Sequence, residues 1–333
     1  MAKVGDGVVT LVDHAKRLDP DGKIARIAEM LSESNEIMND MPFVEGNLVT
    51  GHLGTMRTGL PTVYWRKLNQ GISPSKSTTA QVTESCAILE ARSHVDVDLA
   101  SLNGETGAFR LSEAKAFIEA MTQEFVQTFF YGSPSAPEEF VGLADRYSDT
   151  TAANGDNIIL GGGAGADNSS IWLIGWADDT IHGIYPKGSS AGLQHKDLGT
   201  QLIQTGTNGP DVATMEAYVD KWQMKAGLFL KDWRYAVRIP NIDISNLVGE
   251  SSAADLTKLM IKSIHRIPNK SKVKLCFYAN RSVIQMLDIQ RRDNVQDGGG
   301  LSFQNEQGEP VMTFRGIPVR LCDQLTEAES LVS

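Results

Sequence analysis

Residues 112–132, SEAKAFIEAMTQEFVQTFFYG, carry the longest helical pattern in the chain. Apolar residues recur three and four positions apart, which predicts one amphipathic helix over residues 112–131, with a stripe made of Ala114, Phe117, Ile118, Met121, Phe125 and Phe129. Ser112 is expected to be the N-cap, because its hydroxyl can accept from a free N–H group of the first turn. Gly132, as a left-handed cap, and Pro134 are expected to end the helix. Twenty helical residues rise about 30 Å, so this helix is expected to be the spine of a domain.

The composition is that of a soluble globular protein that is moderately acidic. The 333 residues contain 31 Lys and Arg against 41 Asp and Glu, a formal charge of −10, and 41% are hydrophobic. Such a chain is not built to hold phosphate over its whole surface. No apolar run approaches the roughly 20 residues of a membrane-spanning helix, and the N-terminus lacks the pattern of a signal peptide. We therefore expect no membrane partner.

The cysteines and histidines do not predict a metal centre. Cys86, Cys276 and Cys322 are far apart in the sequence, so neither a disulfide framework nor a zinc site is expected. We expect all three to be buried free thiols. The histidines lack the spacing of metal ligands: His14, His52, His94, His182, His195 and His265. We expect no cofactor and no metal.

One segment has an unusual charge. Residues 47–83 contain no Asp or Glu, while Arg57, Arg66, Lys67 and Lys76 give it +4, so the remainder of the chain carries −14. Within residues 51–97 we expect two strands, at 62–68 (TVYWRKL) and 81–97, joined by the polar connection NQGISPSKSTTA. Such a hairpin is marginally stable alone and must lie on another surface. Its excess of basic residues favours an acidic neighbour, so the four cations are predicted to lie at a subunit interface.

The remaining pattern mixes helices and strands in blocks, which predicts an α+β fold. Helices are expected at 21–39, 253–267 and 281–294. Strands are expected on either side of Asp178–Asp179 within 170–185, over 216–244 with a fold at Lys231–Asp232, and at 272–278, 311–314 and 317–321. Residues 186–210 are expected to be a polar, glycine-rich excursion.

Two short motifs suggest enzymes. Residues 161–166, GGGAGA, fit the phosphate-binding glycine pattern, but a strand-like run follows where a helix is required. Residues 188–192, GSSAG, fit the nucleophile elbow of serine hydrolases, with Ser190 as nucleophile and Asp232 or Asp243 and His265 in the expected order. Pro186 interrupts the strand that should lead into that serine, so we favour loops at both motifs. No residue is assigned a catalytic role, and a serine hydrolase stays open as a rival.

The order of these parts resembles the major capsid protein of tailed bacteriophages, which has the Hong Kong 97-type shell fold. The resemblance covers roughly residues 20–325. Five stretches are similar: IAEMLSESNEIMNDMPFVEGN (27–47), FVQTFFYGSPSAPEEFVGL (125–143), WRYAVRIPNID (233–243), FYANRSVIQMLD (277–288) and FRGIPVRLCDQL (314–325). Its strength lies in several weak motifs that occur in the family's order.

The resemblance implies a division of the chain and a function. It implies an N-terminal arm with a helix over 1–46, an extended hairpin loop over 47–97 and a peripheral domain with the spine helix over 98–145. Residues 146–250 would form the axial domain and connecting strands, and 251–333 the remaining axial elements and the return to the peripheral domain. The protein would be a structural component that self-assembles into hexamers and pentamers of an icosahedral phage head. An encapsulin-like compartment of the same fold stays open as an alternative.

The resemblance also implies partners. Some relatives begin with a scaffold-like segment that is later cleaved, whereas here the arm occupies about the first 45 residues. A separate scaffolding protein is therefore expected, together with a portal and a possible decoration protein. Packaged double-stranded DNA would be enclosed without sequence-specific binding. The protein would reside in the virion shell, after assembly in the cytoplasm of a bacterial host.

Overall fold

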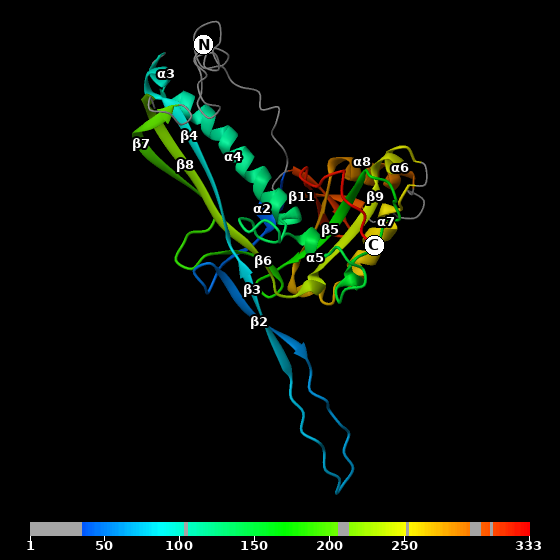
Figure 1. The fold of residues 1–333 in the computed structure, drawn as a ribbon. Helices are drawn as coiled ribbons and strands as arrows, with labels where there is room; N and C mark the ends of the chain where they lie inside the picture. Colours follow the sequence, from blue (N-terminus) through cyan, green and yellow to red (C-terminus); the bar gives the residue numbers. More distant parts are fainter. Residues whose placement is uncertain (1–34, 103–105, 206–212, 251–252, 294–300, 307–308) are drawn as a thin grey trace. The chain divides into compact units, whose positions relative to one another are not determined.

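The computed structural model describes residues 35–102, 106–205, 213–250, 253–293, 301–306 and 309–333. The described residues form two compact units, each built from segments that are distant in the sequence (Figure 1). The first unit contains 88–126 and 190–225, and the second contains 34–87, 127–189 and 226–333. Most of the helix expected over 21–39 lies outside the described residues, and its end forms α2 (Ile37–Asp40). The five-part division of the chain stays a prediction.

The second unit is organised around β5 (Asn168–Trp176), in which all nine residues are buried. β5 pairs antiparallel with β9 (Ala236–Asp243) and with β10 (Lys274–Ala279). β10 continues the sheet through β13 (Ile317–Leu321), β12 (Glu309–Phe314) and β11 (Leu301–Glu306). β5 also neighbours β6 (Ile181–Tyr185) in the sheet, and β6 pairs in turn with β1 (Phe43–Glu45). A strand buried on both faces is expected to be mostly apolar, which residues 171–176 (IWLIGW) satisfy, while Asn168, Ser169 and Ser170 at its start are buried polar residues.

Helices complete the second unit: α5 (Leu143–Arg146), α6 (Ile244–Val248), α7 (Leu256–Arg266) and α8 (Arg281–Asp293), with 3-10 turns η1 (Gly155–Asn157), η2 (Trp233–Tyr235) and η3 (Lys270–Lys272). α7 begins where the carboxylate of Asp255 accepts from the N–H of Lys258, an N-cap that the structure adds to the expected helix. Its buried face consists of Leu256, Leu259, Met260, Ser263 and Ile264. The expected helices at 253–267 and 281–294 are confirmed, with ends shifted by a few residues.

The first unit joins β4 (Ala87–Asp96), α3 (Val97–Ser101) and most of α4 (Thr106–Tyr131) to the antiparallel strands β7 (Leu193–Thr205) and β8 (Ala213–Leu230). The side chain of Asp96 caps α3. Arg110 forms two hydrogen bonds to the Asp220 carboxylate, at 3.1 and 2.8 Å. The ring of Phe117 stacks on Trp222 with centroids 5.1 Å apart.

The spine helix α4 exists but begins at Thr106, so the predicted start at Ser112 is wrong. Phe109 is fully buried in a cluster with Val95 and Ala100, and this packing extends the helix by six residues. Ser112 therefore lies inside the helix. Ile118 is 40% exposed and does not belong to the buried stripe.

The end of α4 agrees with the prediction, but the reason differs. Gly132 does not adopt a left-handed conformation. Its N–H donates to the Thr128 carbonyl at 2.8 Å, and a Cβ there would collide with the carbonyl oxygens of Phe140 and Thr128. Glycine is needed at this position for close approach of the backbone.

Two strand predictions and one loop prediction differ from the structure. Residues 62–68 have strand composition but no regular structure, because none of the described strands pairs with them. The strand expected over 81–97 is divided at Cys86, between β3 and β4. The Cys86 N–H donates to the Thr50 carbonyl at 2.9 Å, in register with the β2–β3 pairing. The expected excursion over 186–210 contains β7, which its polar composition had hidden. The chain does fold near Lys231–Asp232, but β8 and β9 pair with other strands.

Candidate assembly interface

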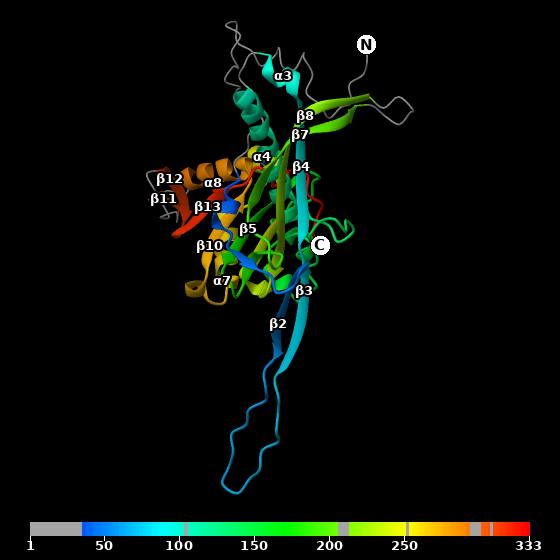
Figure 2. The same ribbon diagram turned by 90° about the vertical axis from the view of Figure 1, so that its left-hand side faces the viewer.

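The predicted hairpin is formed by β2 (Gly51–Gly59) and β3 (Thr78–Ser85), paired antiparallel from Gly51↔Ser85 to Gly59↔Thr78. It extends away from the rest of the second unit (Figures 1 and 2). Residues 60–77, which we call the loop tip, have no regular secondary structure apart from a turn at Leu68–Asn69. Asn69 takes a positive φ of 59° there, a conformation that asparagine tolerates well.

The base of the hairpin is held by side chains of the second unit. Arg146 forms a bidentate ion pair with Glu84 of β3, at 2.5 and 2.7 Å. Gly54 of β2 lies directly against the ring of Phe229, leaving no room for a larger side chain. Such fixed contacts orient the start of the hairpin, because a bidentate pair restricts direction as well as distance.

Two histidines also pack at this base. The ring of His52 lies 4.7 Å from that of Phe229, and the ring of His182 lies 5.3 Å from it. Burial lowers the pKa of His182, and the nearby His52 lowers it further. Burial, followed by the charge of Lys231, lowers the pKa of His52. Protonation of either ring is therefore less favourable than that of a free imidazole, which suits their role as packing groups.

The loop tip exposes an unusual number of large apolar side chains. Trp65 is fully exposed at 104%, and five others accompany it: Leu60, Val63, Tyr64, Leu68 and Ile72. The tip makes few bonds to itself, among them one from the Ser75 hydroxyl to the Thr62 carbonyl at 2.7 Å. Six large apolar side chains exposed within 13 residues are a concentration that is typical of protein–protein contacts.

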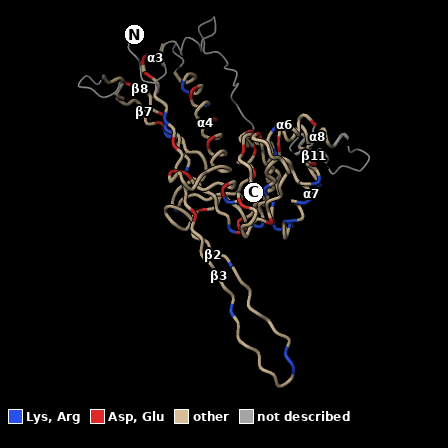
Figure 3. Tube along the Cα trace, turned by 45° about the vertical axis from the view of Figure 1, so that its right-hand side comes forward, with Lys and Arg blue, Asp and Glu red and all other residues tan. Residues whose placement is uncertain are grey.

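The structure also exposes the four predicted interface cations, Arg57, Arg66, Lys67 and Lys76. Arg57 lies on β2 and the other three lie in the loop tip (Figure 3). No ion pair joins any of them to a carboxylate within the described part of the chain. Sequence reasoning found the charge but gave no weight to the apolar side chains between the cations. The consecutive apolar residues Val63, Tyr64 and Trp65 were the available signal, and they were attributed to a strand.

The two enzyme-like motifs lie in loops. Residues 160–166 precede β5, and a Cβ at Gly161 would meet the carbonyl oxygens of Asn241 and Pro240. These glycines allow backbone packing against β9 and do not open a helix. Ser190 is exposed, and β7 follows it, so it is not in the strand–turn–helix geometry of a nucleophile elbow.

Other potential sites do not assemble within the described residues. No group of three or more His, Cys, Asp or Glu side chains able to hold a metal occurs among them. None of their helices is long and apolar enough to cross a membrane. Burial raises the pKa of Cys276 to about 12 and that of the half-buried Cys86 to about 11, so both remain neutral thiols.

The fold is similar to those of solved phage proteins. The chain is 28% identical to a chain in the near-atomic structure of bacteriophage Epsilon15, with a TM-score of 0.77 over 100% of this chain and 99% of that one. The bacteriophage JBD30 capsid also matches, at 8% identity with a TM-score of 0.47, covering 91% of this chain and 96% of that one. The capsid of a native GTA particle matches at 10% identity with a TM-score of 0.46, covering 67% and 95%. No curated protein sequence matches.

The match to the Epsilon15 chain defines a phage capsid fold of the Hong Kong 97 type, mixed in helix and sheet. The family model of the major capsid protein GP7 matches residues 19–333. The chain belongs to this family. It is a structural protein of the phage head that assembles with copies of itself, and it resides in the virion shell. The family favours the phage shell over an encapsulin-like compartment.

Proposed function

We propose that the loop tip docks on a neighbouring copy of the chain and so joins subunits within hexamers and pentamers of the head. Two properties of residues 60–77 support this proposal, namely the apolar side chains around Trp65 and the adjacent cations. The contact is heterologous, because a loop on one copy meets a different surface on the next. Repeated rotations of such contacts close into rings.

Apolar burial supplies most of the free energy in this proposal. A buried tryptophan removes about 200 Å² from water, and at about 25 cal/mol per Å² this contributes roughly 5 kcal/mol before ordering costs. Exposed ion pairs contribute only about 0–1 kcal/mol each. The cations Arg66 and Lys67 therefore select an acidic surface and fix the register of docking.

Each contact is weak enough to be corrected during growth, and many together hold the particle by avidity. As DNA fills the head, the spine and the arm change orientation as rigid bodies, a transition between two packed states. The acidic body suits a container that encloses DNA without binding it in a sequence-specific manner. In this proposal the chain has no enzymatic role.

Further partners belong to the proposal. A separate scaffolding protein guides assembly in the bacterial cytoplasm, and a portal occupies one vertex. A decoration protein is a possible addition, since one matched JBD30 capsid is decorated with minor capsid protein trimers.

The variant Arg66→Glu/Lys67→Glu tests docking of the loop tip. Particles are counted by negative-stain microscopy, with the protein alone and with a scaffolding protein. The variant is expected to remain folded by circular dichroism and to form few or no particles. The control Lys187→Glu/Lys196→Glu makes the same charge change at exposed sites outside the hairpin. Normal particles from the loop-tip variant would refute the docking role.

A further inference from the structure

A second segment without acidic residues lies outside the hairpin. Residues 256–287 contain seven Lys and Arg and no Asp or Glu, a charge of +7. Together with residues 47–83, which carry +4, this leaves 264 other residues with 20 Lys and Arg against 41 Asp and Glu, or −21. The chain thus has two strongly basic segments on an otherwise acidic protein. The second is the more basic of the two.

The fold gathers much of this charge on one part of the second unit (Figure 3). Lys258 and Lys262 occupy the exposed face of α7, opposite its buried stripe. Lys270 and Lys272 follow in η3, and Arg315 comes from the turn between β12 and β13. We call these five exposed residues the basic patch.

Within the described residues, no carboxylate lies within ion-pair distance of the cations of the basic patch, although the pKa of Asp179, lowered mainly by its hydrogen bond with Lys231, is lowered further by the charge of Lys272. Other cations in the same segment do have partners. Lys274 lies 2.7 Å from Asp40, and Arg281 lies 2.7 Å from Asp323. The fold therefore neutralises part of the segment and leaves the patch itself open to an external anion.

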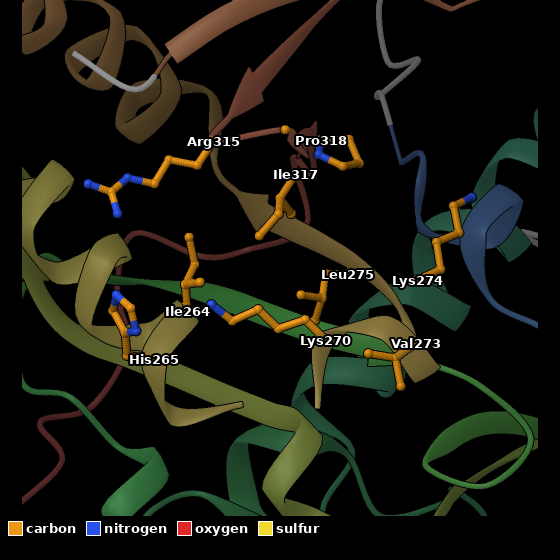
Figure 4. A pocket seen from close by; sticks show the side chains of 10 residues that line it. Ile264, His265, Lys270, Val273, Lys274, Leu275, Arg315, Ile317 and Pro318 are labelled. Atoms are coloured by element: carbon orange, nitrogen blue, oxygen red, sulfur yellow. The ribbon is translucent and has the colours of Figure 1, made fainter. Parts of the chain in front are cut away.

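A pocket of about 520 Å³ is lined by two residues of the patch, Lys270 and Arg315. Its apolar lining comes from α7, β10 and β13, and consists of Ile264, Val273, Leu275, Ile317 and Pro318. Figure 4 shows Lys270, Arg315 and His265 on one side of the pocket, while Lys274 points away from them toward α2. The site thus combines an apolar floor with a cationic rim. This arrangement fits a peptide surface that inserts an apolar side chain and surrounds it with carboxylates.

We propose that the basic patch is a second assembly contact, which binds an acidic surface of a neighbouring copy and receives an apolar side chain in its pocket. This inference rests on the proposed function, because it takes the neighbour to be another copy in the shell. The argument for a copy is charge complementarity. Outside its two basic segments every copy carries −21, and assembly brings copies together at high local concentration.

The shape of the site favours a protein surface over nucleic acid. Duplex DNA is held by a track of cations that follows its phosphates, and burial of apolar side chains is not required. Here Lys270 and Arg315 border a concave apolar pocket. An apolar pocket with polar groups at its edge is the arrangement found at the core and rim of protein interfaces.

The test compares Lys262→Glu/Lys270→Glu with the control Lys187→Glu/Lys196→Glu, which changes the charge equally at exposed positions outside the patch. The full chain is used in whichever preparation yields wild-type particles, alone or with a scaffolding protein. Sedimentation velocity measures the assembled fraction. We expect about a tenfold lower fraction for the patch variant, little change for the control, and an intermediate loss for Lys262→Gln/Lys270→Gln. Raising the salt from about 0.05 to about 0.5 M should reduce the difference.

Two results would overturn the inference. In one, the patch variant assembles like wild type; if it has also lost binding to a duplex DNA probe that wild type retains, the patch is assigned to nucleic acid. In the other, the control loses assembly to the same extent as the patch variant. Failure of the proposed function is distinguishable, because it appears in the loop-tip variant Arg66→Glu/Lys67→Glu. If that variant assembles and the patch variant does not, only the docking of the loop tip is refuted.

Discussion

Trp65 offers the sharpest test of how copies of this chain meet. Its side chain is fully exposed, so Trp65→Ala removes no contact within the described chain and is expected to change the free energy of unfolding by no more than about 0.5 kcal/mol. In an assembly the same side chain would be buried. The loss of about 200 Å² of buried surface, reduced by ordering costs, weakens each docking contact by roughly 2–4 kcal/mol. That corresponds to a factor of about 30–1,000 in the equilibrium constant of one contact.

Fluorescence quenching reports this burial directly. Three of the five tryptophans, Trp172, Trp176 and Trp222, are at most 3% exposed, and Trp233 is half-buried. Acrylamide is therefore expected to quench Trp65 most strongly in the unassembled protein. On assembly the quenchable fraction should fall in wild type and change little in Trp65→Ala.

The matched control is Trp65→Phe, which keeps an apolar ring and should retain most of the assembly. Sedimentation velocity then compares the concentration at which particles form for the three proteins. The reasoning fails if Trp65→Ala assembles at the wild-type concentration. It also fails if Trp65 remains fully accessible to acrylamide in finished particles.

Three further predictions concern the fold. Glu329→Gln breaks a buried ion pair, in which Arg238 Nη2 lies 2.8 Å from Glu329 Oε2 and both side chains are at most 4% exposed. Denaturant titrations should show a free energy of unfolding lower by about 3–5 kcal/mol, and a loss below about 1 kcal/mol would contradict this. Because burial lowers the pKa of His182 and of His52 in the folded chain, the unfolded chain binds more protons below pH 6.5, so stability should be complete above that pH and decrease as pH falls below it. His182→Phe should reduce this pH dependence in thermal melts, and an unchanged dependence would assign it to other groups. Gly54→Val should distort the hairpin base at a cost of about 1–3 kcal/mol, visible in the same melts, whereas full stability would show that the neighbouring ring moves aside.

Apolar patterns in the sequence were sufficient to predict the helices and strands that contribute to the hydrophobic core. Residues 171–176 of the buried β5 are a continuous apolar run, and the apolar period over 253–267 predicts α7, because a fold must remove these side chains from water. The charge of residues 47–83 is also a property of the sequence alone. These features depend only on the spacing and composition of residues, so they can be predicted from a single sequence.

Tertiary structure decided what depends on neighbours. Burial of Phe109 against Val95 and Ala100 set the start of α4, which the capping pattern at Ser112 misplaced. Residues 62–68 have the composition of a strand, but backbone N–H and C=O groups form a ladder only when a second strand lies beside them.

The basic patch shows the same division. The sequence determined its charge, and only the fold placed Arg315 beside Lys270, 45 positions away in the chain, at the edge of one apolar pocket. A pocket forms only when folding brings separate segments together. The spacing of residues along the chain therefore does not predict which of them will line it.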